Sequence, residues 1–210
     1  GRYAEADPLY QRALAINEKV LGPDHPKVAM ALNNRALLLE KQGRYAEAEP
    51  LYERSQAILE EVLGPEHPDV AAVLKNRSGL LSALAKYDEA QPLLERALAI
   101  HESALGTDHA DTITSRVWMA VLYTKQGLLD KASPLLRDLP SAYERVHGPD
   151  HPNVASALNY RAGLLKSQGK YDEAGPLCAR AIAIGEKVLG PEHPDLGAWL
   201  NNRAWLLIAQ

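Results

Sequence analysis

Apolar residues recur at intervals of three and four along most of the chain, the spacing that places them on one face of an α-helix. The first such run covers about residues 3–20 and the next about residues 26–41. Gly22 is suited to end the longer helix, and either Asp24 or His25 can serve as the N-cap of the shorter one. No segment alternates with a period of two, so strands are not expected. The pattern predicts an all-α protein.

This pair of a longer and a shorter helix returns every 42 residues without an insertion. The segment GRYAEA opens the chain and returns at Gly43, and related segments begin at Ala85, Gly127 and Gly169. A fixed period in this range is typical of a solenoid, in which each unit buries its apolar face against its neighbours. We therefore expect one array of ten antiparallel helices in five periods, which are residues 1–42, 43–84, 85–126, 127–168 and 169–210.

Each period carries a proline early in its longer helix, where the loss of one backbone hydrogen bond is tolerated. These residues are Pro8, Pro50, Pro92, Pro134 and Pro176. Pro140 is different because it lies well inside the helix, at a position where the other periods have Leu14, Gln56, Leu98 and Ile182. We predict a kink or break close to Leu139, at a local cost of about 3 kcal/mol.

The repeated segments resemble the tetratricopeptide repeat (TPR), in the 42-residue variant typical of kinesin light chains and nephrocystin-3-like proteins. The match rests on LNNRALLLEKQGRYAEAEPLYERS from Leu32, LGPEHPDVA from Leu63 and GKYDEAGPLCARAIAIGEKVLGPEHPD from Gly169. The resemblance covers the full chain. It implies a right-handed superhelix of helix pairs whose concave groove binds peptides or partner proteins.

The family usually has leucine after the asparagine pair, whereas four periods of this chain have arginine there: Arg35, Arg77, Arg161 and Arg203. This position should face the longer helix of the same period, where an unpaired charge would be costly. The third period has Met119 at this position and Lys131 where the matching periods have glutamate, so arginine and glutamate disappear together. The pattern predicts three ion pairs, Arg35–Glu47, Arg77–Glu89 and Arg161–Glu173.

Composition narrows the possible partners and compartments. The formal net charge of −4 argues against nucleic acid as the partner. No apolar run is long enough to span a bilayer and no signal-peptide pattern is present, so no membrane association is expected. Because the chain opens within a repeat, a targeting segment that was cut away is an alternative. The single cysteine, Cys178, allows no intrachain disulfide, which favours a reducing, cytoplasmic location. We interpret Cys178 as a small buried apolar residue.

The residues that often mark catalysis or metal binding have a simpler interpretation in this chain. His25, His67, His109, His151 and His193 are one loop position repeated five times. Neighbouring copies should lie about 10 Å apart, which is too far to share an ion with bonds near 2 Å. We interpret them as residues that start helices. With no phosphate loop, nucleophile elbow or CxxC motif, we expect neither a cofactor nor an enzyme.

Residues that vary between periods on the shorter helices are the candidates for binding. In a TPR-like stack these helices line the concave face, so variable side chains on them should project into the groove. Asparagine amides can both donate to and accept from the backbone of an extended peptide, aromatic residues can anchor it, and lysines favour acidic ligands. The predicted peptide-binding residues are Asn33, Asn34, Lys75, Asn76, Trp118, Lys125, Asn159, Tyr160, Lys166, Asn201 and Asn202. Further variable positions of the same face include Val121, Thr124, Gly163 and Ser167.

The leading hypothesis is therefore a non-catalytic scaffold that binds a protein or extended peptide, acidic with an aromatic anchor, in its groove. A second hypothesis is an architectural array that spaces domains or self-associates end to end. Each end would expose an unpaired packing face, and Trp199 and Trp205 near the C-terminus would suit such stacking. The family resemblance adds a third possibility, the sensor array of a receptor with a nucleotide-binding NB-ARC domain.

Overall fold

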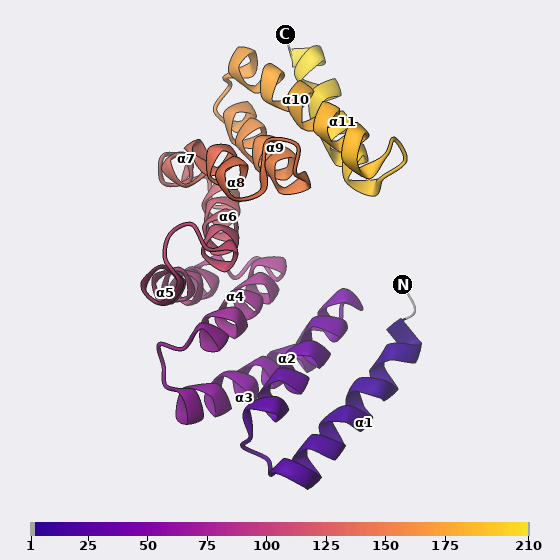
Figure 1. Cartoon of the computed structure of the whole chain (residues 1–210), viewed down its shortest axis with the longest axis vertical. Coiled ribbons are helices and arrows are strands. Elements are labelled where there is room, and N and C mark those ends of the chain that lie inside the picture. Colours follow the sequence, from indigo (N-terminus) through magenta and orange to yellow (C-terminus); the bar gives the residue numbers. More distant parts are fainter. Residues whose placement is uncertain (1–2, 210) are drawn as a thin grey trace. The chain divides into compact units, whose positions relative to one another are not determined.

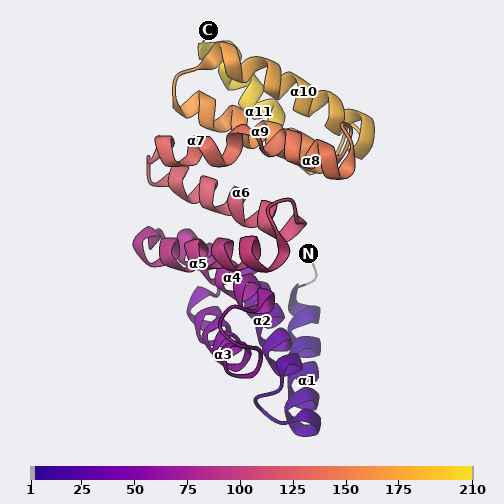
Figure 2. The ribbon, with the colours of Figure 1, turned by 60° about the vertical axis from the view of Figure 1, so that its left-hand side comes forward.

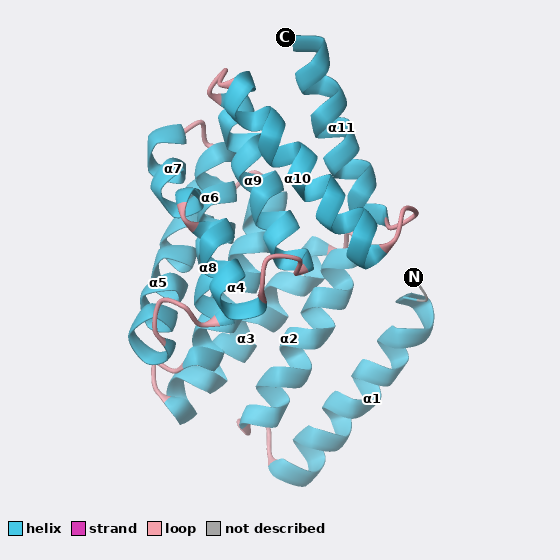
Figure 3. Cartoon of the chain, turned by 45° about the horizontal axis from the view of Figure 1, so that its top comes forward, coloured by secondary structure: helices cyan, strands magenta, loops and turns pink. Residues whose placement is uncertain are grey.

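A computed structural model of the chain describes residues 3–209, and within that range it contains helices, turns and no strand (Figures 1 and 3). The helices are α1 (Tyr3–Leu21), α2 (Pro26–Lys41), α3 (Tyr45–Leu63), α4 (Pro68–Ala83), α5 (Tyr87–Leu105), α6 (Ala110–Lys125), α7 (Leu129–Arg137), α8 (Leu139–His147), α9 (Pro152–Ser167), α10 (Tyr171–Leu189) and α11 (Pro194–Ala209). The prediction of an all-α fold is confirmed. Outside the fourth period, a helix of 19 residues alternates with one of 16 residues, as the periodicity predicts.

The turn from each longer helix to the next shorter one has the same construction in every period. A glycine with a positive φ ends the longer helix, as at Gly22 and Gly64, where φ is 90°. The histidine three residues later caps the shorter helix: His25 Nδ1 accepts a hydrogen bond from the Lys27 N–H at 3.1 Å. Equivalent bonds are made by His67, His109, His151 and His193. The histidines are thus residues that start helices, and His25, not Asp24, is the N-cap.

The longer helix of the fourth period is divided, as Pro140 predicts. Helix α7 ends at Arg137 and α8 begins at Leu139, with Asp138 between them (Figure 2). Proline has no N–H to donate, and its ring collides with the carbonyl group one turn earlier. The ten helical positions of the five periods therefore appear as eleven segments over the described residues.

The chain forms two compact units, Gly1–Ser115 and Arg116–Gln210, and the division between them falls within the residues of α6. In the first unit, Leu32 of α2, Tyr52 of α3 and Leu74 of α4 are fully buried. In the second unit, Cys178 packs with Ala162, Ala174 and Leu206 in a cluster formed by α9, α10 and α11. The shorter helices α2, α4 and α9 each have an extensive contact with the longer helix that follows them.

Trp199 does not lie on an exposed end face, contrary to the expectation that it would suit end-to-end stacking. Its side chain is only 4% exposed. It packs against Gly185 of α10 so closely that a Cβ atom at Gly185 would collide with the indole ring. Trp205 is exposed, and its ring meets Tyr171 edge-on with 5.5 Å between the ring centroids.

Candidate functional site

In the second unit, the shorter helices α6, α9 and α11 border a cavity of 290 Å³, and α7 contributes one further lining residue. It is lined by Val121, Thr124, Lys125, Leu136, Asn159, Tyr160, Gly163, Leu164, Lys166, Ser167 and Asn202. Five of the predicted peptide-binding residues meet here: Lys125, Asn159, Tyr160, Lys166 and Asn202. The volume is close to the lower limit of small-ligand pockets, which span about 300–1,000 Å³. It is enough for a side chain and a short stretch of backbone.

A chain of polar contacts fixes the side chains along one wall of this cavity. Asn202 Nδ2 donates to Asn159 Oδ1 at 3.0 Å, and Lys166 Nζ donates to Asn202 Oδ1 at 3.0 Å. The same ammonium group lies 5.1 Å from the centroid of the Trp205 ring. Among the described residues nothing accepts a hydrogen bond from Asn159 Nδ2. The wall is therefore held rigidly while one amide donor stays available to a ligand.

The first unit repeats the asparagine contact. Asn76 Nδ2 donates to Asn33 Oδ1 at 2.9 Å, across the same pair of positions in neighbouring shorter helices. Asn34 is exposed, while Lys75 is half-buried. Burial lowers the pKa of Lys75, and the nearby carboxylate of Asp111 partly offsets this effect. The asparagines thus join neighbouring shorter helices through hydrogen bonds.

Of the predicted residues in the second unit, two do not line the cavity. Trp118 on α6 is 38% exposed, and Asn201 on α11 is exposed. The sequence-based prediction in turn missed Leu136 and Leu164, which also line the cavity. Both lie on apolar stripes, so their only signal in the sequence is the one that marks every core residue. Whether an apolar side chain of the stripe also touches a cavity depends on how its neighbours pack.

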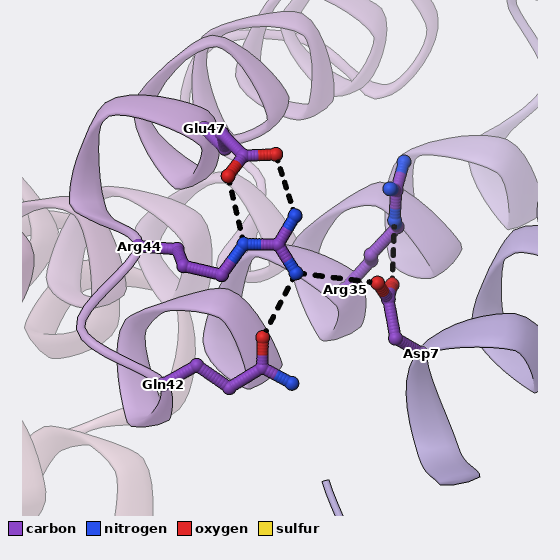
Figure 4. A network of polar contacts seen from close by, with 5 residues as sticks. All are labelled: Asp7, Arg35, Gln42, Arg44 and Glu47. Carbon is purple, nitrogen blue, oxygen red and sulfur yellow. Dashed lines mark hydrogen bonds and ion pairs between the residues drawn. The ribbon is translucent and has the colours of Figure 1, made fainter. Parts of the chain in front are cut away.

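The three ion pairs predicted from the arginine pattern are wrong. Arg35 pairs with Asp7 of α1, with 3.1 Å between Nε and Oδ1, and Glu47 is held by Arg44 (Figure 4). Arg77 pairs with Glu53 and Glu49, Lys86 pairs with Glu89, and Arg161 donates to the carbonyl oxygen of Arg137. The arginine does face the longer helix of its own period. Its partners therefore come from that helix and not from the start of the next one.

The electrostatic consequence is visible at Asp7. Burial by itself would raise the pKa of this carboxyl group, but the hydrogen bond and positive charge of Arg35, with further help from Arg44, lower it below its usual value. The Asp7 side chain is only 14% exposed. It is a charge that two guanidinium groups hold in place.

Three further features bear on covalent catalysis, metal binding and membrane insertion. Burial raises the pKa of the Cys178 thiol, which disfavours the nucleophilic thiolate. Among residues 3–209, no three His, Cys, Asp or Glu side chains gather closely enough to hold a metal ion. Over the same residues, no helix combines the length and apolar character needed to cross a membrane.

Comparison with known proteins identifies the repeat. The family model described as "Tetratricopeptide repeat" matches residues 1–58, 27–103, 78–139, 111–174 and 153–210, which together cover the chain. A search of curated protein sequences finds no match.

Solved structures share the fold. Nearly identical TPR-like repeats of a protein assigned as a kinesin light chain from Podosopora anserina have 27% identity to this chain and a TM-score of 0.73, and the alignment covers 89% of each chain. BtubC (BKLC) of P. vanneervenii has 18% identity and a TM-score of 0.82, with 100% of this chain and 84% of that chain covered. YrrB, a TPR protein with an unusual peptide-binding site, has 19% identity and a TM-score of 0.60, with 95% and 86% covered.

Proposed function

Because the chain belongs to the tetratricopeptide repeat family, whose repeats generally mediate protein–protein interactions and form non-catalytic scaffolds, we propose that it binds an extended segment of a partner protein along its shorter helices. The cavity between α6, α9 and α11 is the anchor site. The observation that carries the proposal is the gathering of five predicted binding residues around that one cavity.

The cavity offers three kinds of contact to a peptide. Asn159 Nδ2 can donate to a backbone carbonyl group of any residue, which gives affinity without sequence selectivity. Tyr160, 41% exposed at the rim, can stack against an aromatic or apolar side chain. Lys125 and Lys166 supply positive charge, which favours acidic residues beside the anchor. The preferred ligand is thus an acidic segment with one aromatic or large apolar side chain.

A glycine at the centre of the cavity allows a direct test. Gly163 has open space around it, and the first period has Leu37 at the equivalent position, so the substitution Gly163→Leu should fill the cavity while the helix is retained. Peptides selected by the wild-type protein from a random phage-displayed library should bind the G163L variant at least about tenfold more weakly, a loss of about 1.4 kcal/mol. Fluorescence anisotropy with labelled peptides measures the change.

The matched control is Gly197→Leu on α11, because Gly197 also has open space but does not line the cavity. It should leave the affinity of the same peptides unchanged. Selected peptides that bind wild-type and G163L protein equally well, with both proteins folded, would rule out the cavity as the anchor site.

A further inference from the structure

Where the first period joins the second, a carboxylate group lies between two guanidinium groups (Figure 4). Asp7 contacts Arg35 through Oδ1 at 3.1 Å and Arg44 through Oδ2 at 3.4 Å. Arg44 also donates to Gln42 at 3.0 Å and pairs with Glu47 at 2.7 Å. The five side chains come from α1, α2, the turn after α2 and the start of α3, so they form a small site where three helices meet.

The boundary between the fourth and fifth periods has the same constellation without its carboxylate. Shifting each position by three periods places Arg161, Gln168, Lys170 and Glu173 at the positions of Arg35, Gln42, Arg44 and Glu47. The counterpart of Asp7 is Ser133. All five of these residues line one cavity of 190 Å³, together with Arg137, Leu164 and Leu165. A water molecule takes up about 30 Å³, so the space left by the missing aspartate can hold a larger group.

The charge around this cavity is unbalanced. Three cations, Arg137, Arg161 and Lys170, line it with the single carboxylate of Glu173. None of the three cations forms an ion pair with a carboxylate among the described residues. At the break before Pro140, the carbonyl oxygen of Arg137 replaces the missing carboxylate in part. Arg161 Nη1 donates a hydrogen bond to this oxygen at 3.1 Å. The remaining N–H groups of the half-buried Arg161 are left for another acceptor.

We propose that this cavity binds a carboxylate group in the place that Asp7 takes in the first period. The planar guanidinium of Arg161 matches a carboxylate in shape, and Lys170 adds a second positive charge to the lining. An acidic side chain of a bound protein and a small carboxylate ion present the same chemistry to it. The cavity is distinct from the peptide anchor site, with which it shares only Leu164, and it does not depend on the proposed function.

The first experiment supplies the carboxylate from within the chain. Ser133→Asp should restore the arrangement of the first period and raise the midpoint of thermal unfolding by about 2–4 °C relative to Ser133→Asn, its neutral counterpart of the same shape. The folded-state pKa of the new aspartate would be lowered by Arg161 and Lys170. Its gain should therefore be present at neutral pH and disappear as the pH falls below about 4. Equal midpoints for S133D and S133N at neutral pH would overturn the proposal.

The second experiment adds the carboxylate from outside. In NMR spectra of arginine-labelled protein, the Nε–Hε signal of Arg161 should shift saturably when acetate replaces chloride at constant ionic strength. The shift should be lost in S133D, where the site is filled, and in Arg161→Met, which copies Met119 of the third period. It should persist in Lys187→Met, which removes one positive charge at the separate Lys187–Asp150 pair.

Two further probes separate the sources of the group. If N-acetyl hexaglutamate saturates the Arg161 signal at a lower concentration of carboxylate groups than acetate does, the site takes an acidic side chain of a polypeptide. If acetate is as effective, it takes a small carboxylate ion. Inorganic phosphate that binds more tightly than both would overturn the assignment to carboxylate, as would linear shifts that are equal in wild-type protein and S133D.

Discussion

At the residue scale, the third period buries polar side chains where the second period buries apolar ones. His101 and Ser115 take the positions of Leu59 and Val73 of the second period, and all four are buried or nearly so. The two polar groups satisfy each other, with 2.9 Å between His101 Nδ1 and Ser115 Oγ. Thr112, also buried, donates to the carbonyl oxygens of His101 and Gly106. Because these bonds exist only in the folded chain, the cluster links stability to pH.

Lowering the pH should destabilise the protein through His101. Burial lowers the pKa of this imidazole, Lys75 and His109 add to the effect, and the charge of Asp111 and a backbone hydrogen bond at Pro68 oppose it. The unfolded state therefore binds the proton more tightly. The stability associated with the neutral ring is fully present above pH about 6.5 and falls by up to about 1.4 kcal/mol per unit below it.

Urea unfolding between pH 7.5 and 5.5 measures this loss. The double substitution His101→Leu and Ser115→Val copies the second period. It should lower the number of protons taken up on unfolding by about one, and so flatten the dependence of stability on pH. A wild-type protein and a double variant with parallel stability profiles over that range would contradict the assignment.

At the element scale, backbone chemistry at the ends decides where each helix lies. Positive-φ glycines and histidine caps fix the turns after α1, α3, α5, α8 and α10. Pro140 adds one further break, at a position where the first and third periods have Leu14 and Leu98. The break also frees the carbonyl group of Arg137, which Arg161 then uses. One proline thereby changes both a helix and the hydrogen bonding of an adjacent cation.

Replacing Pro140 with leucine should join α7 and α8 into one continuous helix. The restored backbone hydrogen bond and the removal of the ring collision are worth up to about 3 kcal/mol. Circular dichroism at 222 nm should show more helix, and the unfolding midpoint should rise. Pro134→Ala is the matched control, because every period has a proline there early in the longer helix and the change should alter helix content little. Unchanged ellipticity in P140L would mean that packing of α8, not the proline, imposes the break.

At the scale of the whole molecule, burial depends on whether another helix follows. Leu32, Leu74 and Leu158 are buried, but Leu200 at the equivalent position of α11 is 48% exposed. Leu39, Leu81 and Leu165 are likewise buried, whereas Leu207 is 59% exposed. In the earlier periods the next longer helix covers these positions. The exposed face of α11 thus has the composition of a helix interface, as expected of a solenoid in which each repeat is stabilised by its neighbours.

We expect this 210-residue chain to self-associate through that face at high concentration. Light scattering should show an apparent mass that rises with protein concentration. Leu200→Lys should suppress the rise, because a charge cannot be buried against another apolar helix without a partner. Val62→Lys on α3, where the native side chain is also 48% exposed, is the control and should have no effect. A constant monomer mass in the wild-type protein over the whole range would exclude the association.

The sequence by itself determined the helices, their turns, the 42-residue period and the break at Pro140, because these follow from interactions between residues a few positions apart. It also placed five of the residues that line the anchor site on one face of the shorter helices. Only the tertiary structure decided that Arg35 pairs with Asp7 and not Glu47, that Asn33 bonds to Asn76, and that the place of Ser133 is open. These contacts join residues tens of positions apart. They depend on how far one helix is shifted along its neighbour, which the periodicity of a single helix does not encode.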